Sequence, residues 1–520
     1  LFQKLRGIFA FVLYDLISRE VIAARDHTGI KPLYYTERDG SILFASEIKA
    51  LLCWPGMKAR LNEGALPKFL SFLWVPAPET LFEGISILEP AHHFTIGRDR
   101  RSLRKFWQPD LWEADDTTTE AEWVARLDSE FQRVVREQMI SEVPLGAFLS
   151  GGVDSSTIVA YMNRISEQPV ITYTTGFDRA DLEHDVIGSD LEYARIAAKQ
   201  LRVESHEIIL RPDVVQLLPK LVWHMDEPPA DPAAVTTYLI CQAAKEKCTV
   251  MLSGVGGDEI FGGYPRYLAN LLAEKYQKIP SPIRNGLIEP IARQLPTGSV
   301  TFIRNMKKFL KSAKLSFLER YFGYLTYYSH QELQQLLRAE YDWSSVFEIH
   351  RSFFQTDHAD RPLQSMMNLD LKTFLPNLNL MYTDKMSSAS AVEVRVPFLD
   401  HLLVEMAARI PGRMKIRRTT RKYVLKKLAQ NLLPKEVVWR RKAGFGAPIG
   451  AWLKGQAREM MQDLLSKETV RKRGLFHYQA VDKLIQDHLE GKEYNANQIW
   501  QLMTLELWFQ RFFDRSCANE

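Results

Sequence analysis

The sequence predicts an α/β protein with a strand-rich N-terminal region, a parallel sheet and a helical C-terminal part. Residues 1–105 hold β-branched and aromatic runs separated by short polar turns, a pattern typical of antiparallel strands. From residue 143 to residue 252, short apolar runs alternate with helical patterns, which indicates right-handed crossovers and a parallel sheet. Residues 265–370 and the C-terminal tail have the apolar spacing of packed helices.

The composition narrows the class of protein. Hydrophobic residues make up 46% of the 520 positions, and 67 basic residues nearly balance 63 acidic ones, which argues against general nucleic-acid binding. The four cysteines form no C-x-x-C pair, so a disulfide framework or a structural zinc site is not expected. No apolar run reaches membrane-spanning length. We expect a cytoplasmic protein with neither membrane nor nucleic-acid partners.

The N-terminal region and the segment after it can be divided by their turn signals. Asp39-Gly40 is a typical two-residue hairpin turn. A linker is expected at 106–118, where Thr117 and Glu120 can form a capping box for a helix with apolar residues between 123 and 139. The expected N-terminal strands are at 7–15, 19–26, 33–36, 41–46 and 92–96.

The turn LSGGVDSS at residues 149–156 is the central motif, and it lies between a strand-length apolar run and a buried helix. Backbone N–H groups and the helix dipole converge at such a turn, and glycines let a phosphate approach the main chain. Ser155 and Ser156 add hydroxyl donors, and the Asp154 carboxylate can hold Mg²⁺. No lysine follows the glycines as in a Walker A loop. The turn is similar instead to the Ser-Gly-Gly-x-Asp-Ser loop of enzymes that split ATP into AMP and pyrophosphate; the alternative is a turn without a ligand.

A second glycine-rich loop, at 253–264, follows another short apolar strand. Because ligands of parallel sheets bind beyond the carboxyl ends of the strands, we expect Asp154 and Asp258 to face each other across adjacent loops. Thr175, at the end of a further strand, is expected beside them. Two carboxylates that flank a triphosphate suit a magnesium-assisted displacement at phosphorus. The alternative is a solvated glycine loop without a ligand.

Three later segments carry charge. Glu393 and Arg395 lie in an apolar run and are expected to be buried, either as an ion pair or as a ligand site. The basic run at 413–427 holds one aromatic residue, Tyr423, and no pattern of interleaved aromatic residues, which favours a solvated helix face over nucleic-acid stacking. The segment at 440–448 contains glycines that could fold a cation back over a phosphate.

Taken in order, these motifs resemble those of glutamine-dependent asparagine synthetases. The resemblance implies that residues 1–105 are the C-terminal half of a type 2 glutamine amidotransferase domain of N-terminal-nucleophile fold. A linker at 106–118 and a synthetase domain at 119–520, with an adenine nucleotide α-hydrolase-like sheet, would follow. The matching segments are 6–11, 24–26, 29–35 and 44–51 in the glutaminase part, and 149–156, 253–264, 393–400 and 440–448 in the synthetase part.

The resemblance also implies a reaction. In this family ATP adenylates the β-carboxylate of aspartate, ammonia attacks the acyl-adenylate, and asparagine, AMP and pyrophosphate leave. The half-domain that carries the catalytic cysteine is not in the sequence, so free ammonia rather than glutamine is expected to supply nitrogen. Three alternatives stay open: a related amidotransferase acting on a sugar acid or natural-product carboxylate, a tRNA-modifying enzyme, favoured only by the 413–427 run, and a non-enzymatic scaffold that binds nucleotide without turnover. The expected partners are small molecules, and a homodimer is left open.

Specific residues match the family's site by position. Val255 stands where many members carry an acid that helps deprotonate ammonium, so another group assists, the acceptor differs, or turnover is slow. Lys442 matches a lysine that stabilises charge at the reacting phosphate and carbonyl, and Asp154 and Asp258 would hold magnesium. Further candidates for substrate contacts are Lys385, Lys422 and Glu259. The residues that would bind ATP are Leu149, Ser150, Gly151, Gly152, Asp154, Ser155, Ser156, Thr175, Ser253 and Gly254.

Overall fold

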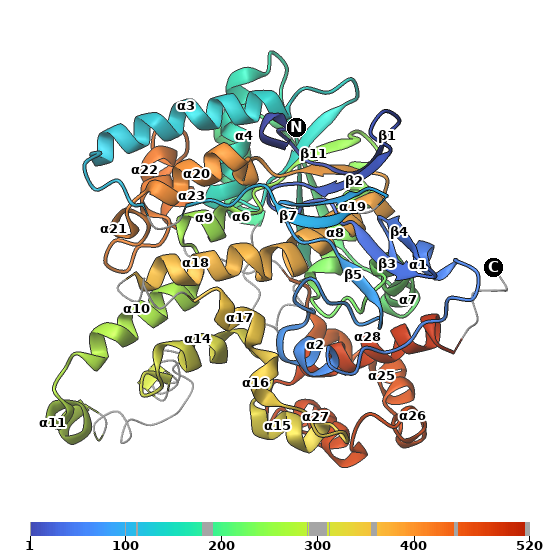
Figure 1. Ribbon diagram of the computed structural model, residues 1–520. Coiled ribbons are helices and arrows are strands. Elements are labelled where there is room, and N and C mark those ends of the chain that lie inside the picture. The colour runs from blue at the N-terminus through green and yellow to red at the C-terminus, as the bar shows by residue number, and fades with distance from the viewer. Residues whose placement is uncertain are drawn as a thin grey trace.

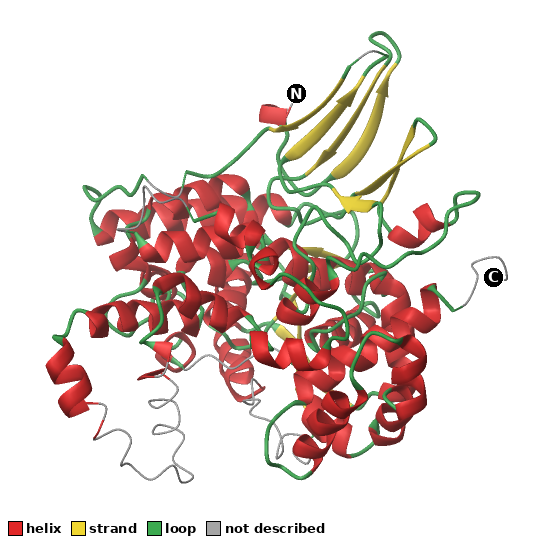
Figure 2. Cartoon of the chain, turned by 60° about the horizontal axis from the view of Figure 1, so that its bottom comes forward, coloured by secondary structure: helices red, strands yellow, loops and turns green. Residues whose placement is uncertain are grey.

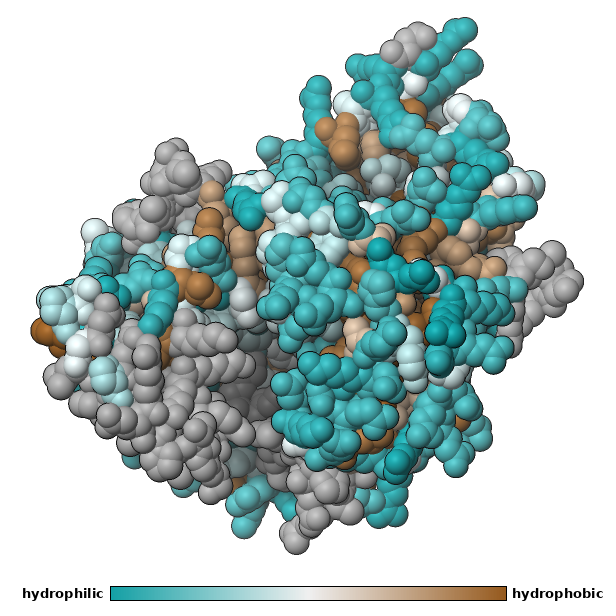
Figure 3. All heavy atoms as spheres, turned by 90° about the horizontal axis from the view of Figure 1, so that it is seen from below, coloured by the Kyte–Doolittle hydropathy of each residue, from teal (hydrophilic) through white to brown (hydrophobic). Residues whose placement is uncertain are grey.

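A computed structural model shows how these segments are arranged (Figure 1). Figure 2 shows the N-terminal strands standing out as a layer from a body made mainly of helices. On the face seen in Figure 3, hydrophobic residues lie in small groups among hydrophilic ones. None of the helices in the described ranges has both the length and the apolar character needed to cross a bilayer. The structure describes residues 2–98, 100–110, 113–178, 191–288, 290, 309–310, 312–354, 361–440 and 446–514.

The N-terminal region forms two antiparallel sheets. All five predicted strands are present, and Asp39 and Gly40 both have positive φ, at 51° and 76°, as the hairpin turn requires. The strands β5 and β7 were not predicted, because one has three residues and the other is mainly polar. One sheet has the order β1 (Ala10–Asp15), β2 (Glu20–Arg25), β6 (His92–Ile96), β7 (Arg101–Lys105), and the other has the order β4 (Ser41–Ala45), β3 (Tyr34–Arg38), β5 (Ile85–Ile87). Short helices complete the region: η1 (Phe2–Lys4), α1 (Ile48–Leu52) and α2 (Leu66–Phe72).

The capping box of the first long helix, α3 (Glu120–Gln138), lies two residues later than predicted. Thr119 and Glu122 form it, and not Thr117 and Glu120. Thr117 is not free for this role because its N–H and hydroxyl both donate to the Asp115 carboxylate, at 3.0 and 2.6 Å.

The second part of the chain is built on a five-stranded sheet in which every neighbouring pair is parallel, as predicted. The chain runs outward from β8 through β9 to β10, then returns to the other side of β8 for β11 and β12. The strand order therefore reverses between β8 and β11, and ligands of open α/β sheets bind at such a point. The order is β10 (Glu204–Leu210), β9 (Ile171–Phe177), β8 (Leu145–Phe148), β11 (Val250–Leu252), β12 (Glu393–Arg395).

Helices cover this sheet and form the rest of the body (Figure 1). Between β8 and β11 the described helices are α4 (Val153–Ile165), α6 (Leu191–Leu201), α7 (Val214–Met225) and α8 (Ala233–Ala244). Between β11 and β12 lie α9 (Gly257–Phe261), α10 (Pro265–Gln277), α11 (Ser281–Ile283), η2 (Arg284–Ile288), α14 (Phe317–Leu325), α15 (His330–Leu336), α16 (Trp343–Val346), α17 (Glu348–Ser352), α18 (Pro362–Lys372), η4 (Leu375–Asn379) and α19 (Leu380–Ala389). After β12 come η5 (Pro397–Leu399), α20 (His401–Arg409), α21 (Gly412–Lys415), α22 (Tyr423–Ala429), α23 (Lys435–Trp439), α24 (Ile449–Lys454), α25 (Arg458–Leu464), α26 (Lys467–Arg473), α27 (Tyr478–Leu489) and α28 (Ala496–Phe512).

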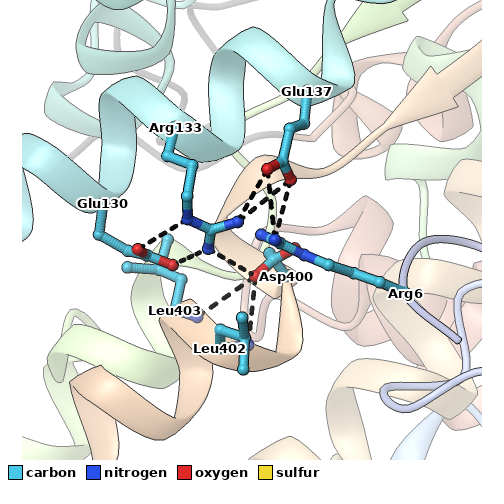
Figure 4. Close-up of polar contacts among 7 residues, drawn as sticks. All are labelled: Arg6, Glu130, Arg133, Glu137, Asp400, Leu402 and Leu403. Carbon is cyan, nitrogen blue, oxygen red and sulfur yellow. Dashed lines mark hydrogen bonds and ion pairs between the residues drawn. The ribbon is translucent and has the colours of Figure 1, made fainter. Parts of the chain in front are cut away.

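Polar contacts tie the N-terminal region to this body. Arg6 donates to Asp400, at the start of α20, at 2.8 Å, and it is ion-paired with Glu137 of α3 at 3.0 Å (Figure 4). Arg133 of α3 lies against the same two carboxylates, at 3.6 Å from Asp400 and 3.1 Å from Glu137. The network joins three segments that are far apart in the sequence, close to the segment that follows β12.

Candidate functional site

The loop after β8 is folded as an anion cradle. The Ser150 N–H donates to Ser155 Oγ at 3.1 Å, and the two hydroxyls are 3.0 Å apart. Gly151 has a φ of +65°, and a Cβ there would lie 2.6 Å from the Tyr193 carbonyl carbon, so only glycine suits the position. Gly152 is the N-cap of α4, and the first N–H groups of that helix lie at the loop. Such a helix N-terminus attracts phosphate oxygens.

The loop after β11 lies directly against this cradle. A Cβ on Gly254 would lie 2.7 Å from Ser155 N and 3.0 Å from Asp154 Cβ. Gly256 is the N-cap of α9, with a φ of +96°, and a Cβ there would lie 2.5 Å from the Leu399 side chain. The prediction that the two loops are adjacent is confirmed, and the contact depends on the absence of a side chain at Gly254.

Asp154 and Asp258 converge on a single cation, the ammonium of Lys422. Its Nζ lies 2.5 Å from Asp154 Oδ2 and 2.6 Å from Asp258 Oδ1, and Lys422 is only 4% exposed. Burial opposes its charged form, but the two carboxylates outweigh burial and raise the pKa of Lys422. A Cβ on Gly263 would overlap Lys422 Cε and the Asp258 carboxylate, so glycine at 263 leaves the path of this side chain open.

These carboxylates suit a magnesium ion held jointly with phosphates. Within the described ranges no group of three or more His, Cys, Asp or Glu could hold a metal ion without a substrate. Mg²⁺ is commonly bound by one or two carboxylates together with substrate phosphate oxygens. Gly257 leaves room at this point, since a Cβ there would lie 2.8 Å from Asp154 Oδ1. The donor set therefore fits Mg²⁺ that arrives with a nucleotide.

The strand β9 borders the cradle on its other side. The Leu149 N–H donates to the Tyr173 carbonyl at 2.9 Å, and Thr174 Oγ1 donates to the Leu149 carbonyl at 2.6 Å. Thr175 follows at the same edge of the sheet and is half-buried, as expected of a residue beside the loop. Ser253, the first residue after β11, is buried and donates its N–H to the Arg395 carbonyl at 2.8 Å.

The other predicted substrate residues lie in different surroundings. Lys385 forms a buried ion pair with Asp226, and its ammonium lies 4.8 Å from the ring centre of Tyr34. Glu259 is 2% exposed and accepts hydrogen bonds from the Tyr264 hydroxyl at 2.6 Å and from Asn379 at 3.2 Å. Burial, assisted by the charge of Asp258, raises the pKa of Glu259 to about 7.

Lys442, for which the resemblance implies a catalytic role, belongs to the segment 441–445, which is outside the described residues. Glu393 and Arg395 were expected to be buried, but Glu393 is exposed, and the two form an ion pair at 2.6 Å. They lie on β12, an edge strand, which pairs with β11 alone among the strands of the described residues.

The basic run at 413–427 was predicted to be a solvated helix face, and this is wrong for part of it. Lys415 and Lys422 are 2% and 4% exposed. Arg421 also turns inward and donates to the Gly263 carbonyl at 2.5 Å, a contact with the ligand loop that we did not predict. Lys422 has a φ of +55° at the N-cap of α22, which departs from the helical pattern that the run suggests. The signal that could have found these residues is the Thr-Thr pair before Arg421, which interrupts the basic helix face.

Comparisons with known proteins match most of the chain. A family model described as Asparagine synthase matches residues 126–510, and one described as Glutamine amidotransferase domain matches residues 1–107. The chain is similar to glutamine-hydrolyzing asparagine synthetase 1 of Bacillus subtilis, with 32% identity over 508 residues, 97% of this chain and 78% of that protein. Asparagine synthetase 3 of the same organism is 27% identical over 511 residues, 96% of this chain and 76% of that protein. Amidase chyE of Penicillium rubens is 26% identical over 526 residues, 93% of this chain and 76% of that protein.

Proposed function

Because the chain belongs to the asparagine synthase family, as an ATP-dependent ligase of asparagine synthesis, we propose specific roles for the two loops. The cradle after β8 binds the phosphates of ATP, and Asp154 and Asp258 hold a magnesium ion beside them. The convergence of both carboxylates on one cation, next to the N-terminus of α4, is the observation that carries this proposal. When bound, magnesium would neutralise phosphate charge and orient the phosphates for displacement.

The proposed reaction has two steps. A carboxylate oxygen of aspartate attacks the α-phosphorus of ATP, the bond between the α-phosphorus and the bridging oxygen breaks, and pyrophosphate leaves. The nitrogen of ammonia then attacks the acyl carbon, AMP leaves with the electron pair of the carbon–oxygen bond, and the nitrogen loses a proton. The N–H groups of the cradle and the hydroxyls of Ser150 and Ser155 face the charge that grows on pyrophosphate. Lys442 is proposed to stabilise charge at the reacting phosphate and carbonyl.

The loop after β11 has one feature that favours a second candidate. Val255 is half-buried against the apolar core of the sheet, and valine cannot accept a proton from ammonium. General-base assistance is worth about 10²–10⁴-fold in rate. A ligase of this type that amidates a different carboxylate is therefore the second candidate. The domain division at 105 and 118 is part of the same proposal.

Pyrophosphate release from ATP and Mg²⁺ tests both candidates, with aspartate present or absent and with ammonium or glutamine as nitrogen source. We expect the first equivalent of pyrophosphate per enzyme to require aspartate alone, and release beyond that equivalent to require aspartate and ammonium together. Asp154→Asn should lower release by about 10²-fold or more, since one of two metal-binding carboxylates is lost. The matched control is Asp482→Asn on α27, whose carboxylate accepts from the Tyr478 hydroxyl. Release that is insensitive to aspartate would refute the first candidate, and release unchanged in Asp154→Asn would refute the site.

A further inference from the structure

Lys422 is joined to the site from a distant part of the chain. It lies 268 positions from Asp154 in the sequence, and it begins α22 with a left-handed backbone. Arg421 anchors the preceding turn on the Gly263 carbonyl, and the open space above Gly263 lets the Lys422 side chain pass to both carboxylates. The position of the ammonium is thus set by three segments: the first turn of α4, the loop after β11 and the start of α22.

A metal ion that binds both carboxylates needs the space of that ammonium. Mg²⁺ binds oxygen at about 2.0–2.1 Å. Nζ of Lys422 already lies 2.5 and 2.6 Å from the two oxygens that face each other. Two cations cannot share these oxygens, because their repulsion at such a separation, in a site shielded from water, is large. The lysine stem has four rotatable carbons, so the ammonium can leave while α22 stays in place.

We propose that Lys422 and the divalent cation compete for Asp154 and Asp258, so that Lys422 weakens metal binding until phosphates are present to receive its ammonium. The inference rests on the proposed function for the identity of the metal. Lys422 is a positioning residue in this scheme. Its ammonium keeps the two carboxylates together, and when the metal binds, the ammonium moves from the carboxylates to the phosphates. Metal and nucleotide then bind best together, and free metal alone is bound weakly.

The test is titration of the full chain with Mn²⁺ alone, followed by electron paramagnetic resonance, with Mg²⁺ as competitor. Lys422→Met removes the ammonium and keeps an unbranched side chain that is shorter by one atom. We expect it to bind Mn²⁺ about tenfold more tightly than the parent, within the usual range of coupling energies. The matched control is Lys427→Met in α22. The Lys427 ammonium lies 3.7 Å from the carboxylate of Glu120 and not at Asp154 or Asp258, so its loss should leave Mn²⁺ binding unchanged. Equal or weaker Mn²⁺ binding by Lys422→Met would overturn the proposal.

A second measurement uses the parent chain and does not depend on how the variant folds. Lys422 is nearly inaccessible, so its modification by an amine-reactive reagent, followed by mass spectrometry, should be slow. Mn²⁺ should accelerate it severalfold and leave Lys427 unaffected; an unchanged rate at saturating Mn²⁺ would overturn the proposal.

Neither measurement needs ATP or an acceptor, so the inference and the proposed function can fail separately. Tighter Mn²⁺ binding by Lys422→Met without any pyrophosphate release from the parent would support the competition and count against the ligase reaction. Pyrophosphate release by the parent, together with unaltered Mn²⁺ binding by Lys422→Met, would support the ligase reaction and count against the competition.

Discussion

Replacement of Gly254 by alanine tests the contact between the two ligand loops. The new Cβ would lie 2.7 Å from Ser155 N, 3.0 Å from Asp154 Cβ and 3.1 Å from Asp154 C, all of them at the start of α4. An ordinary carbon contact with these atoms needs about 3.5 Å or more, so the loops must separate by several tenths of an ångström. Overpacking of this kind costs about 1–3 kcal/mol. Because misplacement of a site by about 1 Å can cost 10²-fold in rate, we expect about a 10- to 100-fold loss in kcat/KM for ATP.

The assay is pyrophosphate release at varied ATP, together with the melting temperature of each variant. Gly323→Ala is the control, because Gly323 lies inside α14 and nothing is within 4 Å of the position that its Cβ would take. That change should stabilise the chain by about 0.5–1 kcal/mol and leave kcat/KM unaltered. Parent-like stability and kcat/KM in Gly254→Ala would refute the inference that the loops are in contact.

Three further substitutions test the site and its supports. Ser155→Ala removes the acceptor of the Ser150 N–H, so we expect up to about tenfold weaker ATP binding by calorimetry; unchanged binding would contradict the cradle. Asp226→Asn leaves Lys385 buried without its carboxylate and should lower the free energy of unfolding by about 3–5 kcal/mol, visible as a large drop in melting temperature. His350 is fully buried, and burial, together with the charge of Lys68, lowers its pKa from 6.5 to about 3. Between these two pH values the unfolded chain therefore binds one more proton than the folded chain, and the parent loses stability as the pH falls below 6.5. His350→Phe should remove that loss, which amounts to about 2 kcal/mol at pH 5. The measurement is the change in melting temperature between pH 8 and pH 5, and an equal change in parent and variant would contradict the prediction.

The glycine loops and the strands before them could be predicted because their signals are local. A short apolar run followed by glycines and a helical pattern is complete within about 20 residues, and the parallel sheet follows from the alternation of such units. The prediction that Asp154 and Asp258 face each other could also be made from the sequence. It needs only the rule that the loops after adjacent parallel strands meet at the carboxyl edge of the sheet.

What the sequence could not provide are contacts between distant segments. The resemblance marks Lys422 as a candidate for substrate contacts, and a Thr-Thr pair interrupts the basic run before it. Only the folded chain shows that Gly263 leaves Lys422 a path to both carboxylates. Asp226 likewise gives no local sign that it will accept from Lys385, 159 positions away. The capping box was placed two residues too early for a smaller reason: Asp115 competes for the hydroxyl and N–H of Thr117, and a motif pattern does not include competitors.

The sheet's connectivity also bears on how such a protein can diversify. β11 and β12 are neighbours in the sheet, yet every helix from α9 to α19 lies between them in the chain (Figure 1). The chain therefore leaves the sheet after β11, next to the loop that follows β8, forms a large group of helices and returns to the adjacent strand. Substitutions, insertions and deletions within this helical segment can change the surroundings of the proposed nucleotide site while the pairing of β8 with β11 is kept. Related proteins that share this sheet and its two glycine loops can in this way differ in the carboxylate that they amidate.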